Sequence, residues 1–171
     1  MKIHSQSLTK IALIAAVYSA LSLALAPLSF GPVQVRVSEA LTLLPLIYPP
    51  AILGVTLGCF LTNLIGVLMG VNLLGFMDVL IGTLATFIAA TMTYQLRSYQ
   101  FKGFPALSIL SPVLINGFFI GAELAYVFAP VFSLSSILLF GADVALGELI
   151  AVLAFGWPLL KVLKNLTLFQ P

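Results

Sequence analysis

The chain has 171 residues, of which 61% are hydrophobic and only 7% are charged, against roughly 25% charged residues in soluble domains. Such a chain cannot cover a water-facing surface, so its composition excludes a soluble globular protein and predicts an integral membrane protein. Its net charge of +2 reflects seven scattered basic residues against five acidic ones, with no basic run of the kind that binds nucleic acid.

The length limits the domain organisation. A membrane-spanning helix needs about 20 apolar residues, so residues 1–171 form one membrane domain of at most roughly six or seven helices, without room for a soluble domain. No phosphate-binding G-x-x-x-x-G-K-[ST] motif is present, so energy from ATP has to come from a partner. A single cysteine, Cys59, and a single histidine, His4, make neither a disulfide nor a Cys/His set. We therefore expect no metal, no cofactor and no catalytic residue.

Six apolar segments, separated by Pro, Gly and charged residues, predict an all-α membrane protein with a six-transmembrane-helix bundle. In chain order they cover residues 8–28, 38–48, 50–70, 74–97, 105–129 and 134–163. The first also resembles a signal peptide, but Pro27 at the would-be cleavage position and the length of the apolar stretch favour a retained helix. The second is short and contains Pro45, so we expect it to be tilted, broken or partly re-entrant.

The basic residues predict the orientation, because Lys and Arg in short loops stay cytoplasmic. With a cytoplasmic N-terminus, all basic residues but one fall on the cytoplasmic side: Lys2, Lys10, Arg97, Lys102, Lys161 and Lys164. Both termini are thus predicted to be cytoplasmic. The exception, Arg36, lies in the first outer loop, where Glu39 is a local candidate partner.

All the acidic residues lie at outer helix ends or in the outer half of a span in this topology: Glu39, Asp78, Glu123, Asp143 and Glu148. Inserting an ionisable side chain into the middle of a span costs about 2.5 to 3.5 kcal/mol. Because these five acids have only one basic residue near them, a ligand is the predicted partner of the others. The alternative is that these acids reach interfacial water or bond across helices to Ser, Thr or Asn.

Spacing refines this prediction on the last two segments. Asn116 and Glu123 are seven residues apart, so both project from one face and can line one cavity wall. Glu148 is rotated by about 140° from Asp143, so one of the two acids is expected to face elsewhere. Pro112 should kink its helix and free a backbone carbonyl.

Small residues form two stripes with a spacing of four. One ladder, which predicts helix packing rather than binding, consists of Gly54, Gly58, Thr62, Gly66 and Gly70. The other stripe runs along the first helix and consists of Ala12, Ala16, Ala20 and Ala24. It predicts a docking surface, either for a helix of the same bundle or for another subunit.

Two segments resemble the signature of the QueT family: FGPVQVRVSEALTLLP over residues 30–45 and GVTLGCFLTNL over residues 54–64. Members of this family are substrate-binding S-components of energy-coupling factor (ECF) transporters. The resemblance covers essentially the whole chain. It implies a six-helix bundle that binds a 7-deazaguanine such as preQ1, preQ0 or queuine on the outer side. It also implies a complex with a transmembrane coupling subunit and two cytoplasmic ATPases.

The same resemblance implies roles for particular residues. The A-x-x-x-A motif that docks S-components on the coupling subunit matches Ala16 to Ala20, which makes the alanine stripe a partner interface. The loop that closes over the ligand would contain Gln34 and Arg36. The ligand contacts in such proteins cluster on the last three helices, which here carry Asp78, Glu123, Asp143 and Glu148.

The chemistry of a deazaguanine suggests individual contacts. A carboxylate accepts from both N1–H and the exocyclic amine, a role for Glu123 or Glu148, and a second carboxylate, Asp78 or Asp143, would face the ammonium of preQ1. Further candidates are Asn63 or Asn116 for O6 and the pyrrole side, and Phe118, Phe119 or Phe132 for stacking. Arg36 would bond O6 or latch the loop to Glu39. The predicted ligand-binding residues are therefore Gln34, Arg36, Glu39, Asn63, Asp78, Asn116, Glu123, Asp143 and Glu148.

Other functions remain open at this stage. Paired carboxylates also suit an intramembrane enzyme, although no protease motif is present. Acids in the outer half also suit a channel or a proton-coupled carrier, although no internal repeat is visible. An S-component for another small vitamin is a third alternative.

Overall fold

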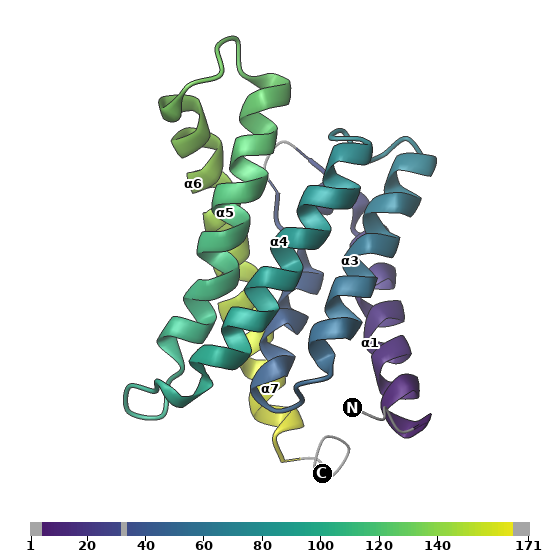
Figure 1. The fold of residues 1–171 in the computed structure, drawn as a ribbon, viewed down its shortest axis with the longest axis vertical. Coiled ribbons are helices and arrows are strands. Elements are labelled where there is room, and N and C mark those ends of the chain that lie inside the picture. Colours follow the sequence, from purple (N-terminus) through teal and green to yellow (C-terminus); the bar gives the residue numbers. More distant parts are fainter. Residues whose placement is uncertain (1–4, 32–33, 166–171) are drawn as a thin grey trace.

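The computed structural model describes residues 5–31 and 34–165, which form a helical bundle (Figure 1). The longer helices are α1 (Ser5–Ala24), α3 (Ala51–Leu68), α4 (Phe76–Gln95), α5 (Ala106–Phe128) and α6 (Leu134–Ile150). Short helical segments are α2 (Ala26–Ser29), the 3₁₀ segments η1 (Val37–Leu46) and η2 (Leu96–Ser98), the π-helical η3 (Ala151–Gly156), and α7 (Trp157–Leu163).

Five helical stretches in the described residues are long and apolar enough to cross a membrane: Ser5–Ala24, Ala51–Leu68, Phe76–Ser98, Ala106–Phe128 and Leu134–Leu163. They correspond to five of the six predicted segments, and the last of them joins α6, η3 and α7 into one span. The chain is therefore a multi-pass membrane protein, as its composition predicts.

The predicted second span, residues 38–48, has a different structure. It forms η1, which has only ten residues and is buried from Ser38 to Pro45. At about 2.0 Å rise per residue, a 3₁₀ helix of this length covers roughly 20 Å, which is less than the hydrocarbon thickness of about 30 Å. The six-span count is thus not confirmed by the described residues, whereas the expected shortness of this segment is.

The order of the helices around the bundle follows the chain. Helix α1 packs on α3, α3 on α4, α4 on α5 and α5 on α6. The buried η1 contacts α1, α3, α4, α5 and η3, so it lies at the centre of this arrangement. Because of this position, side chains of η1 lie next to residues of α1, α3, α4 and α5.

Glycines of the predicted ladder form the contact between α3 and the N-terminal part of the chain. A Cβ atom on Gly58 would lie 2.7 Å from Cβ of Tyr18, and one on Gly66 would lie 2.7 Å from the ring of Phe30. The absence of a side chain is therefore required for this close approach, as the ladder predicts. Gly70 instead belongs to the turn after α3, where its φ of +70° favours glycine.

Helix α5 continues through Pro112, which has no N–H to donate to the carbonyl of Ser108. Thr93 of α4 donates its hydroxyl to that carbonyl oxygen at 3.2 Å, and Ser108 donates its own hydroxyl to the carbonyl oxygen of Thr93 at 3.0 Å. The carbonyl freed by proline thus binds α5 to α4 rather than serving a cavity.

Replacing Thr93 with valine is expected to lower the free energy of unfolding by about 0.6 to 1.7 kcal/mol, the range of interhelical hydrogen bonds in membranes. The shape of the side chain is retained, but the Ser108 carbonyl loses its donor. Unfolding by SDS titration would measure the change. The control is Thr91→Val, two residues away and half-buried, and equal losses in the two variants would contradict the role of this bond.

Apart from Arg36, the basic and acidic residues that the structure describes separate toward opposite ends of the bundle. The described chain begins and ends at the same end, and the loop between α4 and α5, which contains Arg97 and Lys102, also lies there (Figure 1). Asp78, in the first turn of α4, belongs to the other end. Lys2, which contributed to the predicted orientation, lies outside the described residues. The cytoplasmic location of the basic end stays a prediction.

Candidate ligand-binding site

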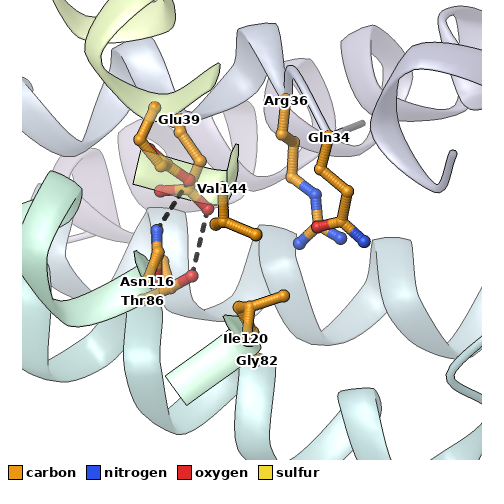
Figure 2. Close-up of a pocket in the computed structure, with 9 residues that line it drawn as sticks. Gln34, Arg36, Glu39, Gly82, Thr86, Asn116, Ile120 and Val144 are labelled. Carbon is orange, nitrogen blue, oxygen red and sulfur yellow. Dashed lines mark hydrogen bonds between the residues drawn. The ribbon is translucent and has the colours of Figure 1, made fainter. Parts of the chain in front are cut away.

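A polar pocket lies where η1 and the segment before it meet α4, α5 and α6 (Figure 2). It is lined by Gln34, Arg36, Glu39, Gly82, Thr86, Asn116, Ile120, Val144 and Glu148. Five of these were predicted as ligand-binding residues from the sequence: Gln34, Arg36, Glu39, Asn116 and Glu148. The fold thus collects into one pocket polar residues that are up to 114 positions apart (148 − 34).

Arg36 is buried, and its guanidinium forms an ion pair with Asp78 of α4. Its Nη2 atom lies 3.5 Å from Oδ2 of Asp78, whose side chain is fully buried. Asn72 donates to the same oxygen at 2.9 Å, and Asn63 donates to the backbone carbonyl oxygen of Asp78 at 2.8 Å. Because a buried charge is stable only when it is paired and hydrogen-bonded, this pair explains the single basic residue at the acidic end.

Glu39 faces a different set of groups. Tyr18 of α1 and Thr86 of α4 both donate to its Oε1 atom, the latter at 3.1 Å, and Figure 2 shows the Thr86 contact. Among the described residues, the ion pair of Arg36 is thus formed with Asp78 and not with Glu39, the local candidate partner. The two residues start the same segment, but η1 turns Glu39 toward α1 and α4 while Arg36 reaches Asp78.

Two carboxylates of the pocket keep unused acceptor capacity. Asn116 donates to Oε1 of Glu148 at 2.8 Å (Figure 2). The Oε2 atoms of Glu148 and Glu39 are buried and have no hydrogen-bond partner among the described residues, and the same holds for the Nε donor of Arg36. Buried polar atoms without a partner are costly, so a ligand that presents donors to both carboxylates would be stabilised here.

The pocket is nearly closed in this conformation. It leaves about 10 Å³ of free space, roughly enough for one water molecule and too little for a bicyclic base. The backbone of Gln34 closes one side, where it packs so closely on Gly147 of α6 that a Cβ atom there would overlap the Gln34 carbonyl oxygen. A larger ligand therefore requires a rearrangement of the residues that line the pocket.

The remaining predicted residues lie outside this pocket. Asn63 and Asp78 are both buried; Asp78 forms the ion pair with Arg36, and Asn63 donates to the backbone carbonyl oxygen of Asp78. Glu123 lines a separate cavity with Phe118, Phe119 and Phe132, the predicted stacking residues. Asp143 is half-buried on α6 and does not line the pocket, whereas Glu148 does, so one of these two acids faces elsewhere as predicted.

Comparison with known proteins gives the family of the chain. The sequence model of the QueT transporter family matches residues 8–165. The chain belongs to the QueT transporter family. It is also 32% identical over 89 residues to the "Queuosine precursor transporter QueT" of Lactococcus lactis subsp. cremoris. That match covers 51% of this chain and 48% of the relative, so the similar region spans about half the length of the curated relative. No solved structure matches the chain.

The QueT family match contains every residue that lines the pocket, and it confirms the resemblance given by the two sequence segments. The chain is thus a member of a transporter family, and its relative carries the name of a transporter rather than of an enzyme. Among the residues that the structure describes, no three His, Cys, Asp or Glu side chains group closely enough to hold a metal ion.

Several residues of this QueT family member that support the pocket were not predicted from the sequence: Tyr18, Asn72, Thr86 and Gly147. A tyrosine in the middle of an apolar first span was a usable signal, because a buried hydroxyl needs a partner in the membrane. Thr86 and Gly147 carried no such signal, since threonine and glycine are frequent in packed membrane helices.

In this QueT family member, the predicted alanine stripe lies on the exposed surface of the bundle and not in its interior. Ala12, Ala16, Ala20 and Ala24 are all exposed, whereas the residues of α1 that pack on α3 lie on another face. The alternative that the stripe packs within the same bundle is therefore excluded for the described residues. A smooth exposed stripe is compatible with lipid or with a helix of another subunit.

A larger cavity, of about 420 Å³, lies at the basic end of the bundle. Among the described residues, its lining includes Arg97, Lys161 and Lys164 and no carboxylate. The acidic groups that suit a donor-rich ligand are thus confined to the opposite half of the described structure.

Proposed function

We propose that this chain is the membrane-embedded substrate-binding subunit of an ECF-type importer that captures a queuosine precursor, preQ1, preQ0 or queuine, from the outer side. Membership of the QueT transporter family and the name of the relative support this substrate. The observation that carries the proposal is the pair of buried carboxylates, Glu39 and Glu148, each with one oxygen that lacks a partner among the described residues.

The pocket suits the hydrogen-bonding groups of a 7-deazaguanine. The base offers N1–H and an exocyclic amine as parallel donors, and a carboxylate accepts both. Glu148 is placed for this role, because its Oε2 is unused and its Oε1 is already oriented by Asn116. The unused Nε–H of Arg36 would donate to O6, the carbonyl oxygen that lies next to N1–H on the same edge of the base. The segment before η1 would move away from α6 to admit the base, and it would then close over the bound base.

The proposal includes partners, because the sequence contains no phosphate-binding motif for ATP hydrolysis. A transmembrane coupling subunit and two cytoplasmic ATPases would supply the energy and release the ligand inward. The exposed alanine stripe on α1 would be the surface that docks on the coupling subunit. Affinity purification from native membranes tests this part, with co-isolation of two ATPases as the expected result.

Equilibrium binding to the purified protein alone tests the substrate. We expect submicromolar affinity for at least one of preQ1, preQ0 and queuine by calorimetry in detergent, with much weaker binding of guanine. Thiamine is the unrelated control. Binding of another vitamin but of no deazaguanine would contradict the substrate, and binding of none of them would contradict a solute-capture function.

A further inference from the structure

A further cavity, of about 340 Å³, opens on the side of the bundle between α4 and α5. Met77 and Ile81 of α4 form one wall, and α5 forms the other with Phe119, Glu123 and Tyr126. Because these residues belong to the first turns of α4 and the last turns of α5, the cavity lies at the acidic end of the bundle. It is thus separate from the polar pocket but lies in the same half of the membrane.

Among the described residues that line this cavity, Glu123 is the only charged one, and it has an unusual environment. The residue is only 3% exposed, and neither carboxylate oxygen has a hydrogen-bond partner among the described residues. The other buried acids differ in this respect: Asp78 is paired with Arg36, and Glu39 and Glu148 each accept at least one hydrogen bond. A buried carboxylate with both oxygens unused costs free energy, and a ligand that supplies the missing donors would remove that cost.

The other walls of the cavity select the type of ligand. They contain four aromatic rings, and the Tyr126 and Phe132 rings stand edge to face with centroids 6.0 Å apart. Aromatic faces attract an organic cation but offer little to an inorganic ion that needs several oxygen ligands. A carboxylate beside aromatic rings is therefore suited to an organic ammonium group.

Glu123 also lies in register with the polar pocket. Glu123 is seven positions after Asn116 on α5. This spacing corresponds to a rotation 20° short of two full helical turns and to about 10 Å along the axis of α5. The Glu123 carboxylate therefore borders the aromatic cavity while lying outward of the residues that orient Glu148. A flat base held at Glu148 with its substituent directed outward would bring that substituent toward Glu123.

We infer that the Glu123 cavity binds the ammonium group of an organic cation. If the proposed function holds, on which this step rests, that group is the aminomethyl ammonium of preQ1. Glu123 then determines the preference among precursors, because preQ0 carries a neutral nitrile at the same position. This assignment replaces the roles expected from the sequence, in which Asp78 or Asp143 faced the cation, since Asp78 already neutralises Arg36.

The first test compares preQ1 and preQ0 by calorimetry on the wild-type protein, Glu123→Gln and Glu123→Asp. The wild type should prefer preQ1, Glu123→Gln should reduce that preference about tenfold or more without changing preQ0 affinity, and Glu123→Asp should retain part of it. Survival of the preference in Glu123→Gln, or its absence from the wild type, would overturn the inference.

A second test does not depend on the substrate. Dicyclohexylcarbodiimide, an apolar reagent for carboxyl groups, should modify Glu123 in the detergent-solubilised protein, as peptide mass spectrometry would show. Benzyltrimethylammonium, a cation that cannot react with the reagent, should slow this modification, whereas neutral benzyl alcohol should not. Lack of modification, or equal rates with and without the cation, would overturn the cation site even if deazaguanines bind. If the cation protects but no deazaguanine binds, the site stands and the proposed function fails.

Discussion

Replacing Arg36 with methionine is expected to lower the free energy of unfolding by about 3 to 5 kcal/mol, the usual cost of removing one partner of a buried ion pair. The reason is that Asp78, whose side chain is fully buried, would lose its counter-charge and keep only the amide of Asn72. Reversible unfolding in mixed micelles, followed by tryptophan fluorescence or circular dichroism, would measure the loss.

A double variant separates the lost pairing from lost packing. In Arg36→Met with Asp78→Asn, the buried position is neutral, so a large part of the stability should return. The coupling free energy from the two single variants and the double variant gives the strength of the interaction. An Arg36→Met protein as stable as the wild type, or a double variant no more stable than Arg36→Met, would show that this pair does not hold η1 against α4.

Replacing Glu148 with glutamine is expected to weaken binding of the captured deazaguanine about 10-fold to 100-fold. The glutamine carbonyl oxygen still accepts from Asn116, so the bundle should fold. The amide NH₂ group, which donates hydrogen bonds and does not accept them, takes the place of the unused Oε2 acceptor. The ligand then loses a charge-assisted hydrogen bond, worth about 1.5 to 3 kcal/mol. Calorimetry on the purified variant measures the affinity, and thermal unfolding without ligand checks the fold.

Asp143→Asn is the matched comparison for this variant. It removes one negative charge from the same helix, but Asp143 lies outside the pocket. The sequence predicted both acids as ligand-binding residues, whereas the structure places only Glu148 in the pocket. Comparing the two variants therefore tests which of these two assignments is correct. A larger loss of affinity in Asp143→Asn than in Glu148→Gln would contradict the pocket described above.

The sequence by itself determined the class of protein and its long helices. A charged fraction of 7% and apolar segments of 18 residues or more are consequences of the membrane environment, and both are visible without any tertiary contact. The small-residue spacing also identified the face of α3 that packs on α1, since only glycine permits that approach. The two motifs were sufficient to identify the QueT family, which the family match confirmed.

The sequence was least informative where a segment did not obey the rules for spans. Residues 38–48 are apolar enough to be read as a helix in lipid, yet η1 is a short 3₁₀ segment enclosed by other helices. Hydrophobicity reports burial but does not distinguish burial in lipid from burial in protein. This ambiguity explains why residues 38–48 were predicted as a span of their own, a count that the five long apolar helices of the described residues do not confirm.

The pairing of polar residues was decided only by the tertiary structure. Glu39 meets Thr86, 47 residues away, and Asn116 meets Glu148, 32 residues away, while Arg36 bypasses the nearby Glu39 for Asp78. Helical periodicity fixes the direction of a side chain relative to its own helix axis, but not the rotation and depth of one helix against another. Those two quantities, set by packing of the whole bundle, determine which acids line the polar pocket and leave Glu123 in its own cavity.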